Sequence, residues 1–338
     1  MADEKFAQTS MALPCSNHKA DDLNGVETIA TTSLSSRLDS NLSSLLRGTN
    51  IYVFGRVQES RLATTALPNI GLIELVSADA FTKLYNAMYI SMFPNTAERE
   101  HSNLICDRLR KEFAGERTDL APYRIVGIRS HDGTAIGAAQ FSVLMLENGR
   151  HAVPYLQYIY VREENRRQDM AEVLHMMVLA VASADAIPRG RSVPFTLFET
   201  EPTGHGDNEA ARRFATQRIH IHSKAGAVGL MLRRQEANGV VVLVSPHCQP
   251  GLEVGEPPLS LLWAVRKSPA TPGGIDVAQI GHNLIAAYYQ SLRDENFPEE
   301  NIQLAEKIVA ERCRDSEYVS VPLNEIVIPR YTYRHVQT

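Results

Sequence analysis

A close succession of apolar runs between residues 123 and 161 constrains the fold more than any other feature of the chain. Three strand-length runs follow one another there: YRIVGIR (123–129), AIGAAQFSVLML (135–146) and VPYLQYIYV (153–161). The first two are joined by Ser-His-Asp-Gly-Thr, in which Gly133 can adopt the positive φ that tight turns use. The sequence therefore predicts a β-hairpin followed by a third strand.

A strand and two helices are expected before these runs. GLIELVSA (71–78) reads as a strand, and the helix after Asp79 has apolar residues at the spacing of one buried face. These residues are Phe81, Leu84, Tyr85, Met88 and Tyr89. Phe93-Pro94 should end this helix, because proline disfavours helical geometry in the preceding residue. Asn95 and Glu98 have the spacing of a capping box for the second helix.

After the third run, helices and strands alternate. A helix is expected whose apolar positions are Met170, Val173, Leu174, Met177 and Val178. A strand at 193–201 and a helix at about 208–224 follow, with Gly226 at the place of a C-cap glycine. Two further strands are expected at 239–246 and 259–267, separated by a loop rich in Pro and Gly. The order is strand, two helices, three strands, helix, strand, helix and two strands, so the fold class is α/β (α+β).

Composition divides the chain into regions. Residues 1–48 are rich in Ser, Thr, Asn and Asp, and so few apolar residues cannot offset the entropy of ordering, which predicts a disordered polar tail. Residues 49–69 are expected to be a linker, and 70–268 the ordered domain. PATPGG (269–274) resembles a second linker. Helical patterns around 275–292 and 299–314 predict a helical C-terminal extension over 275–338, packed on the core.

The charge balance and the cysteines exclude several classes of protein. A net charge of −5 over 338 residues argues against bulk binding of nucleic acid. No apolar run approaches the ~20 residues that span a bilayer, so no membrane association is expected. Four widely spaced cysteines fit free thiols in a cytoplasmic location. His220, His222, His247 and Cys248 lack the spacing of a zinc module, so no metal is expected.

Two stretches of the chain resemble the GNAT (GCN5-related N-acetyltransferase) superfamily. The first is the strand, loop and helix start of YIYVREENRRQDMA. The second comprises FETEP, RRFATQRIHIHSKAGA and the segment SP…QPGL…GEPPLSLLWAVRK. The second stretch is similar to a bacterial acyl-CoA acyltransferase-like subgroup. The resemblance covers about 70–268. It implies a central, mostly antiparallel, splayed sheet flanked by helices, with acetyl-CoA or another acyl-CoA as cosubstrate, and it leaves a homodimer open.

The resemblance assigns the cofactor to the loop before the helix. Helix N-terminal N–H groups bind pyrophosphate, and the preceding strand holds the thioester. The implied residues are Ile159, Tyr160, Val161, Arg166, Arg167, Gln168, Asp169, Met170 and Ala171. Asp169 departs from the family pattern, because it replaces a glycine and adds a negative charge. At ~4 Å a pair of like charges costs about 1 to 4 kcal/mol. The two arginines could offset this cost if Asp169 turns away to cap its own helix, an alternative that implies weakened CoA binding.

The resemblance also implies catalytic residues. Glu199 matches a glutamate of the family strand, and Glu201 lies on the same face of that strand by the two-residue period. Either could act as amine base or bind a cation, and the alternative is a solvated strand end. His222 aligns with the tyrosine that protonates the thiolate, or is simply a polar residue at a helix end. Tyr155 and Gln157 are candidates for the acceptor side, against a packing role.

Together these residues predict an acyl-CoA-dependent N-acyltransferase that acts on a small-molecule amine. The alternative is a GNAT-derived binding or regulatory protein whose CoA site has degenerated through Asp169. A third interpretation keeps CoA and changes the acceptor to a hydroxyl or a protein terminus. The acceptor itself is not predicted, because acceptor sites are built from variable loops and helices.

Overall fold

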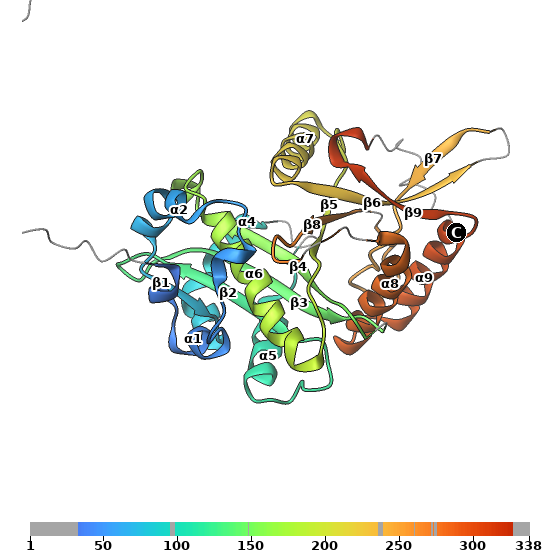
Figure 1. Ribbon diagram of the computed structural model, residues 1–338. Coiled ribbons are helices and arrows are strands. Elements are labelled where there is room, and N and C mark those ends of the chain that lie inside the picture. The colour runs from blue at the N-terminus through green and yellow to red at the C-terminus, as the bar shows by residue number, and fades with distance from the viewer. Residues whose placement is uncertain are drawn as a thin grey trace, which may run out of the picture. The chain divides into compact units, whose positions relative to one another are not determined.

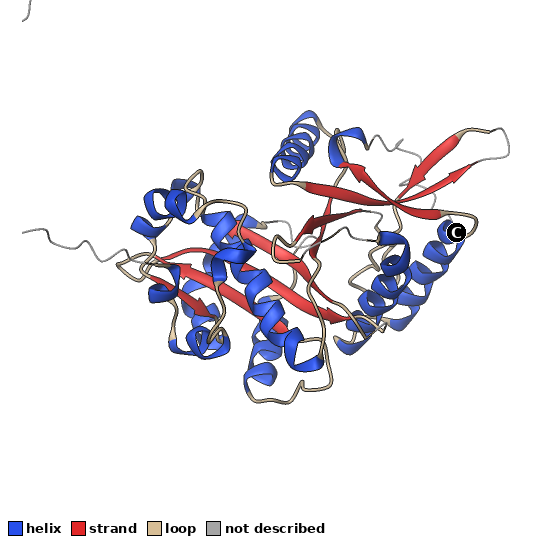
Figure 2. Ribbon diagram, viewed as in Figure 1, coloured by secondary structure: helices blue, strands red, loops and turns tan. Residues whose placement is uncertain are grey.

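One mixed sheet of nine strands organises the part of the chain that the computed structural model describes, which is residues 33–94, 99–147, 149–235, 239–259, 261–271, 273 and 276–326. Eight strands follow the order β1-β2-β3-β4-β5-β8-β6-β7, and β9 pairs with β6. All but one of the pairings are antiparallel. Figures 1 and 2 show the strands with helices packed beside them. The protein is thus a mixed α/β protein with a large, mostly antiparallel sheet.

The first four strands form an antiparallel meander. They are β1 (Leu72–Leu75), β2 (Tyr123–Arg129), β3 (Ala135–Met145) and β4 (Ala152–Val161). Gly133 has φ +85° in the turn between β2 and β3, which confirms the predicted hairpin. Gln140 pairs with Tyr158 while Phe141 pairs with Leu156, so Gln157 is an extra residue that forms a β-bulge in β4.

The fifth strand, β5 (Phe195–Thr200), runs parallel to β4 but pairs with it only briefly. The paired residues are Tyr155 with Leu197 and Leu156 with Phe198. On its other edge, β5 pairs along its whole length with β8 (Leu262–Lys267). Within the described residues, the part of β4 beyond the bulge therefore has no partner strand on the side of β5. The sheet divides there.

The second half of the sheet contains a strand that the sequence pattern missed. β6 (Ala227–Gln235) begins directly after a helix, and its Ala-Val-Gly-Leu-Met-Leu start lacks the alternation of polar and apolar residues that marks a half-buried strand. One edge of β6 pairs with β8 and then β7 (Val241–Val244), and the other pairs with β9 (Glu317–Pro322). The expected pair of closing strands is therefore corrected to a four-stranded arrangement around β6.

One face of the sheet is covered by α6 (Met170–Ala186), with α7 (Glu209–Lys224) over β5 and β6. Val173, Leu174, Met177 and Val178 of α6 are fully buried, as predicted. The segment Met170–Arg189 is long and apolar enough to cross a membrane, which corrects the expectation that no such run exists. Two thirds of it is buried inside the protein, however, as in the core helix of a globular domain.

Residues 33–69, expected to be tail and linker, pack on this same face. They form α1 (Ser40–Leu45), α2 (Glu59–Thr65) and three short 3₁₀ turns (Leu34–Arg37, Ile51–Phe54 and Leu67–Asn69). Leu34, Leu42 and Leu62 are fully buried in the core with α6. The expected disorder is thus wrong for 33–48, because a few well-spaced leucines are enough when a preformed face receives them. Residues 1–32 lie outside the described part.

The other face carries two groups of helices. The first comprises α3 (Ala78–Ala80), a π-helical stretch (Phe81–Tyr85), α4 (Asn86–Met92) and α5 (Ser102–Phe113). The helix ends before Phe93-Pro94 as predicted, while the predicted Asn95–Glu98 cap lies outside the described residues. The second group is α8 (Val277–Asp294) and α9 (Glu299–Cys313), where the sequence predicts helices. Residues 327–338 lie outside the described part.

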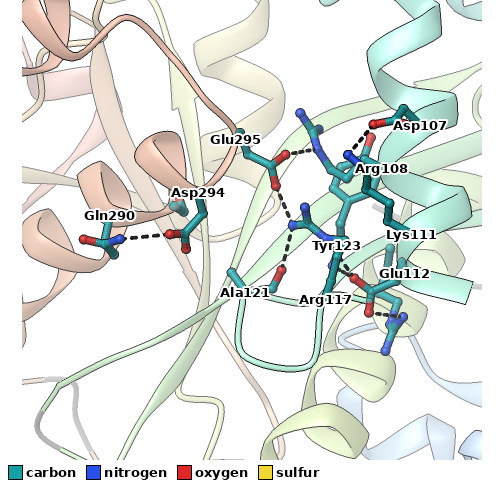
Figure 3. Close-up of polar contacts among 12 residues, drawn as sticks. Asp107, Arg108, Lys111, Glu112, Arg117, Ala121, Tyr123, Gln290, Asp294 and Glu295 are labelled. Carbon is teal, nitrogen blue, oxygen red and sulfur yellow. Dashed lines mark hydrogen bonds and ion pairs between the residues drawn. The ribbon is translucent and has the colours of Figure 1, made fainter. Parts of the chain in front are cut away.

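A buried ion cluster joins these two groups of helices (Figure 3). Glu295, which follows α8, accepts from Nε of Arg108 at 2.6 Å and from a guanidinium N–H of Arg117 at 2.5 Å. Arg108 also donates both other guanidinium nitrogens to Glu100, and its side chain is 6% exposed. The C-terminal helices are therefore fastened to α5 and the loop that follows it.

Candidate functional site

The loop before α6 has a backbone conformation that favours glycine. Arg167 has φ +63° and Asp169 has φ +56°, in the left-handed region that few non-glycine residues adopt. Asp is one of the residues that tolerates this region best. The positive φ gives a physical reason why a glycine is expected at position 169, and why aspartate can stand in its place.

The carboxylate of Asp169 is neutralised by the segment expected to be a linker. Arg61 of α2 binds it with two hydrogen bonds, of 2.8 and 2.9 Å, and Thr65 donates a third at 2.9 Å. Hydrogen bonds from Arg61 hold the pKa of Asp169 below its usual range, against a smaller effect of burial. Asp169 does not cap its own helix through its side chain, so that alternative is wrong. Sequence reasoning missed Arg61 because 108 residues separate the partners.

The other residues of the loop leave donors available. Among the described residues, the backbone N–H groups of Gln168, Asp169, Met170 and Ala171 make no hydrogen bond, and neither does the exposed side chain of Arg167. Arg166 is exposed and contacts the carbonyl of Val161 at 3.3 Å and the sulfur of Met92 at 3.7 Å. Gln168 donates to the carbonyl of Glu164. Met170 is buried and Ala171 is exposed. The loop thus offers unpaired N–H groups and two exposed cations.

The three strand residues assigned to the cofactor lie beyond the bulge of β4, where the sheet divides. Ile159 packs against the core under α6, with Val161. Tyr160 points to the opposite face, where its hydroxyl accepts from the Gln140 amide at 3.2 Å. Gln157, at the bulge, has a buried Oε1 without a hydrogen-bond partner in the described structure. The part of β4 beyond the bulge leads directly into the loop before α6, so the two proposed cofactor regions are consecutive in the chain.

Glu199 lies at the centre of a cluster built by four segments of the chain. Its Oε1 accepts from the Tyr155 hydroxyl at 2.6 Å and from the Tyr288 hydroxyl at 3.5 Å, and lies 2.6 Å from Nε2 of His247. That approach lacks the alignment of a linear hydrogen bond. Oε2 makes no hydrogen bond or ion pair with another described residue, and the side chain is 16% exposed. One carboxylate oxygen is thus anchored and the other is free.

Aromatic rings enclose the His247 side chain, which is 1% exposed. Its ring stacks on Trp263 of β8, with centroids 4.8 Å apart and planes 15° apart, and meets Tyr288 edge-on at 4.9 Å. Arg312 of α9 donates to the His247 carbonyl at 2.9 Å. Burial raises the pKa of Glu199, but His247 and the two tyrosine hydroxyls outweigh it, so that the net pKa is lowered.

Sequence reasoning found Glu199 and Tyr155 but missed His247, Trp263 and Tyr288. The available signals were the single Trp of the chain in a strand, a His after Ser-Pro, and a Tyr-Tyr pair on an amphipathic helix. None of these patterns specifies a contact, because the residues meet only when α8 packs on the sheet.

The structure separates Glu201 from Glu199. β5 ends at Thr200, so the two-residue period does not continue, and the expected shared face is wrong. Glu201 instead forms an ion pair at 2.5 Å with Arg218 of α7, the helix on the opposite face of the sheet. Its carboxylate thus serves as an anchor for α7.

His222 lies at the end of α7, where its ring contacts Phe198 at 4.6 Å. Burial, with Arg218 and Arg266 nearby, lowers the pKa of His222 to about 4. The ring is therefore neutral at pH 7, which does not favour a charged proton donor in the protein alone. Its proposed role toward a thiolate stays a prediction.

A charged bridge crosses between α6 and α7 close to His222. Glu172 of α6 accepts from Arg266 of β8 at 2.5 Å and from the backbone N–H of Arg56 at 2.8 Å. The Arg56 guanidinium donates to the carbonyl of Ala225, the C-cap of α7, at 2.8 Å. Gly226 has φ +77° as the predicted helix end requires, and a Cβ there would collide with that guanidinium. The N-terminal segment thus ties the two helices together.

Comparisons with known proteins give a distant structural likeness and no likeness in sequence. No family model matches the chain, and no curated protein matches it in sequence. A solved structure, described as a GCN5-related glucosamine N-acetyltransferase region in a fungal multi-domain GH3 β-N-acetylglucosaminidase, is similar over 48% of this chain. The match has a TM-score of 0.30 and 13% identity, and it spans 18% of that chain. Among the described residues, no group of three or more His, Cys, Asp or Glu side chains could hold a metal ion.

Proposed function

We propose that the protein is a GNAT-type N-acyltransferase, which transfers an acyl group from acyl-CoA to a small-molecule amine. The observation that carries the proposal is the division of the sheet after Leu156, in the strand that leads into the α6 loop. A slot between two parallel strands that ends at a helix N-terminus suits a long, thin cosubstrate with phosphates at one end. The strand order and the sequence resemblance of 158–171 support the same family, and the bacterial subgroup rests on the sequence resemblance alone.

The α6 loop would hold the phosphates. Its unpaired N–H groups and the positive end of the helix dipole favour an anion, and Arg166 and Arg167 add charge. The charge of Asp169 opposes binding less than the sequence suggests, because Arg61 compensates it. The edge of β4 near Ile159 would hold the pantetheine arm. Acetyl-CoA is the default donor.

The acceptor amine would approach Glu199 from the face that carries α4, α5 and α8. Direct transfer requires the amine to lose a proton before its nitrogen attacks the thioester carbon and the C–S bond breaks. Glu199 would take the first proton of the ammonium group. The CoA thiolate would leave as a thiol after taking up the second proton, which the nitrogen loses as the C–S bond breaks and the amide forms. We propose the cytoplasm as the location, in keeping with three free cysteines among the described residues.

Calorimetric titration with acetyl-CoA and with CoA tests this proposal. We expect micromolar binding that weakens at least fivefold in Arg167→Ala, because an exposed cation without another partner is removed. Arg110→Ala on α5 is the matched control, since Arg110 is also exposed and lies away from the loop. No binding at millimolar ligand, or equal affinity in both variants and the wild type, would overturn the assignment.

A second candidate is a GNAT-derived binding protein that has lost affinity for CoA. Asp169 and the bridge that Arg56 makes between α6 and α7 favour it, because both occupy the side where the cofactor would enter. Asp169→Gly separates the two functions, since glycine keeps the positive φ. A sharp gain in CoA affinity supports the degenerate site, whereas unchanged affinity supports the transferase.

A further inference from the structure

The contact between His247 and Glu199 carries an inference about how a proton is handled. A ring nitrogen and a carboxylate oxygen 2.6 Å apart repel each other unless a proton lies between them or on the ring. Neither ring nitrogen of His247 makes an aligned hydrogen bond within the described residues, so no other contact fixes the tautomer. A proton on Nε2 that faces Oε1 therefore accounts for the close approach.

The surroundings of this pair supply hydrogen bonds but little competing charge. From β4 and α8, Tyr155 and Tyr288 face Glu199 as neutral donors, since burial and the carboxylate raise the pKa of each hydroxyl well above its usual range. Tyr289 and Cys248 lie next to them, with the Tyr289 hydroxyl bound to the Cys248 carbonyl at 2.7 Å. Trp263 of β8 is apolar against the ring. Arg312 of α9 is a cation that contacts this segment, where it donates to the main-chain carbonyls of Ser245 and His247.

We propose that His247 is a positioning residue for Glu199, which fixes Oε1 and keeps the carboxylate ionised so that Oε2 acts as the base for the acceptor amine. This inference rests on the acyltransferase proposed above. Glu199 would meet the ammonium group through Oε2, the oxygen without a partner, while Oε1 stays fixed by the tyrosines. His247 does not touch the acceptor, and it acts through Glu199.

The protons and charges of this step balance. An ammonium acceptor loses one proton to Oε2 of Glu199. The products are a neutral amine and a neutral carboxylic acid, whose Oε1 still faces Nε2 of His247. Total charge in the site is unchanged, which matters in a poorly solvated cluster because separated charges are costly there.

α8 gives the C-terminal extension a part in this site. Tyr288 contacts both members of the pair, its ring packs edge-on against Tyr155 at 5.3 Å, and Glu295 fastens the end of α8 to α5. The extension thus closes the side of the pair that solvent would otherwise reach, and a base shielded from water takes its proton from the substrate.

Carboxyl NMR of the full-length protein, without substrate, tests the pair. In ¹³C-glutamate-labelled protein, the Glu199 signal is assigned by its loss in Glu199→Gln. Because His247 lowers the pKa of Glu199, we expect the titration midpoint of Glu199 to rise by at least one pH unit in His247→Gln. His220→Gln, an exposed change on α7, should leave it in place. An unmoved midpoint in His247→Gln overturns the inference.

Kinetics then test whether His247 supports the base in the reaction, with acetyl-CoA and a panel of primary amines assayed by thiol release. In His247→Gln we expect kcat to fall at least tenfold, KM for acetyl-CoA to change less than twofold, and the acid limb of the pH profile to move upward. A fall in kcat with an unchanged profile would make His247 structural and overturn the inference. A wild-type protein that releases no thiol, while the midpoint does move, overturns the acyltransferase and keeps the pair.

Discussion

Two buried clusters of charge, one beside α5 and one beside β5, differ in how many of their carboxylate oxygens have a hydrogen-bond partner. At Glu295, Oε1 binds Arg117 and Oε2 binds Arg108. Likewise, Oε1 of Glu112 accepts from Arg124 at 2.7 Å and Oε2 accepts from Arg117 at 3.3 Å. At Glu199, three groups gather on Oε1 and none is found on Oε2 among the described residues. Burial alone therefore does not separate structural from functional carboxylates in this chain.

The difference has a thermodynamic meaning. Removing one partner from a saturated buried ion cluster leaves charges without compensation, which is costly. An unsaturated carboxylate carries its cost already in the native state, as buried polar groups without partners do. A protein retains such a cost when the atom without a partner is the one that contacts a ligand. The comparison predicts opposite behaviour when each carboxylate is changed to an amide.

The largest effect is expected for Glu295→Gln. It leaves Arg108 and Arg117 buried beside a neutral amide, so the free energy of unfolding should fall by about 3–5 kcal/mol. Urea unfolding at pH 7 measures this, with Glu300→Gln on the exposed start of α9 as control. A loss no greater than that of the control would show that solvent reaches the cluster and that its saturation does not matter.

The next effect is the pH dependence of stability due to His222. Because the pKa of His222 falls to about 4 on folding, the unfolded chain binds its proton first as the pH drops below about 6.5. This contribution to stability is complete above pH 6.5 and is lost progressively between pH 6.5 and 4, to a total of about 2–3 kcal/mol. His222→Gln should flatten the difference in unfolding free energy between pH 7 and 4.5. An equally steep dependence in the variant contradicts the burial of a neutral ring.

The smallest stability effect is expected for Glu199→Gln. The amide keeps an oxygen that accepts from Tyr155, so the unfolding free energy at pH 7 should change by no more than about 1 kcal/mol. Acyl transfer should instead fall about 10²-fold or more, because the base is removed. Paired urea unfolding and thiol-release assays measure both quantities. A large loss of stability together with unaltered transfer would reverse the comparison and make Glu199 the structural member.

Sequence reasoning reached those parts of this fold that local chemistry determines. The β2–β3 hairpin depends on a Gly133 turn, and the apolar face of α6 depends on helical spacing, and both were predicted correctly. β6 was missed because its sequence lacks alternation and its three partners lie elsewhere in the chain. The ordering of 33–48 was missed because the core that buries Leu34 and Leu42 is formed by later residues.

The candidate site shows the same limit. Glu199 was found through a family resemblance, and Asp169 through a departure from one. Their decisive partners, His247, Tyr288 and Arg61, come from segments that pattern alone assigned to a loop, an appended helix and a linker. Such contacts depend on tertiary packing between positions that are far apart in the sequence. No periodicity within the sequence indicates them.

The pairing of β6 with β9 determines the order in which the two parts of the sheet can form during translation. β6 is flanked by β8 and β7 on one edge and by residues 317–322 on the other, so its hydrogen bonding is completed only when these late residues have left the ribosome. Until then the nascent chain presents an open strand edge, which is the kind of surface on which chains associate wrongly. The β1–β4 meander needs none of these residues. The protein is therefore expected to emerge as an early-folding half and a half that waits for residues 317–322.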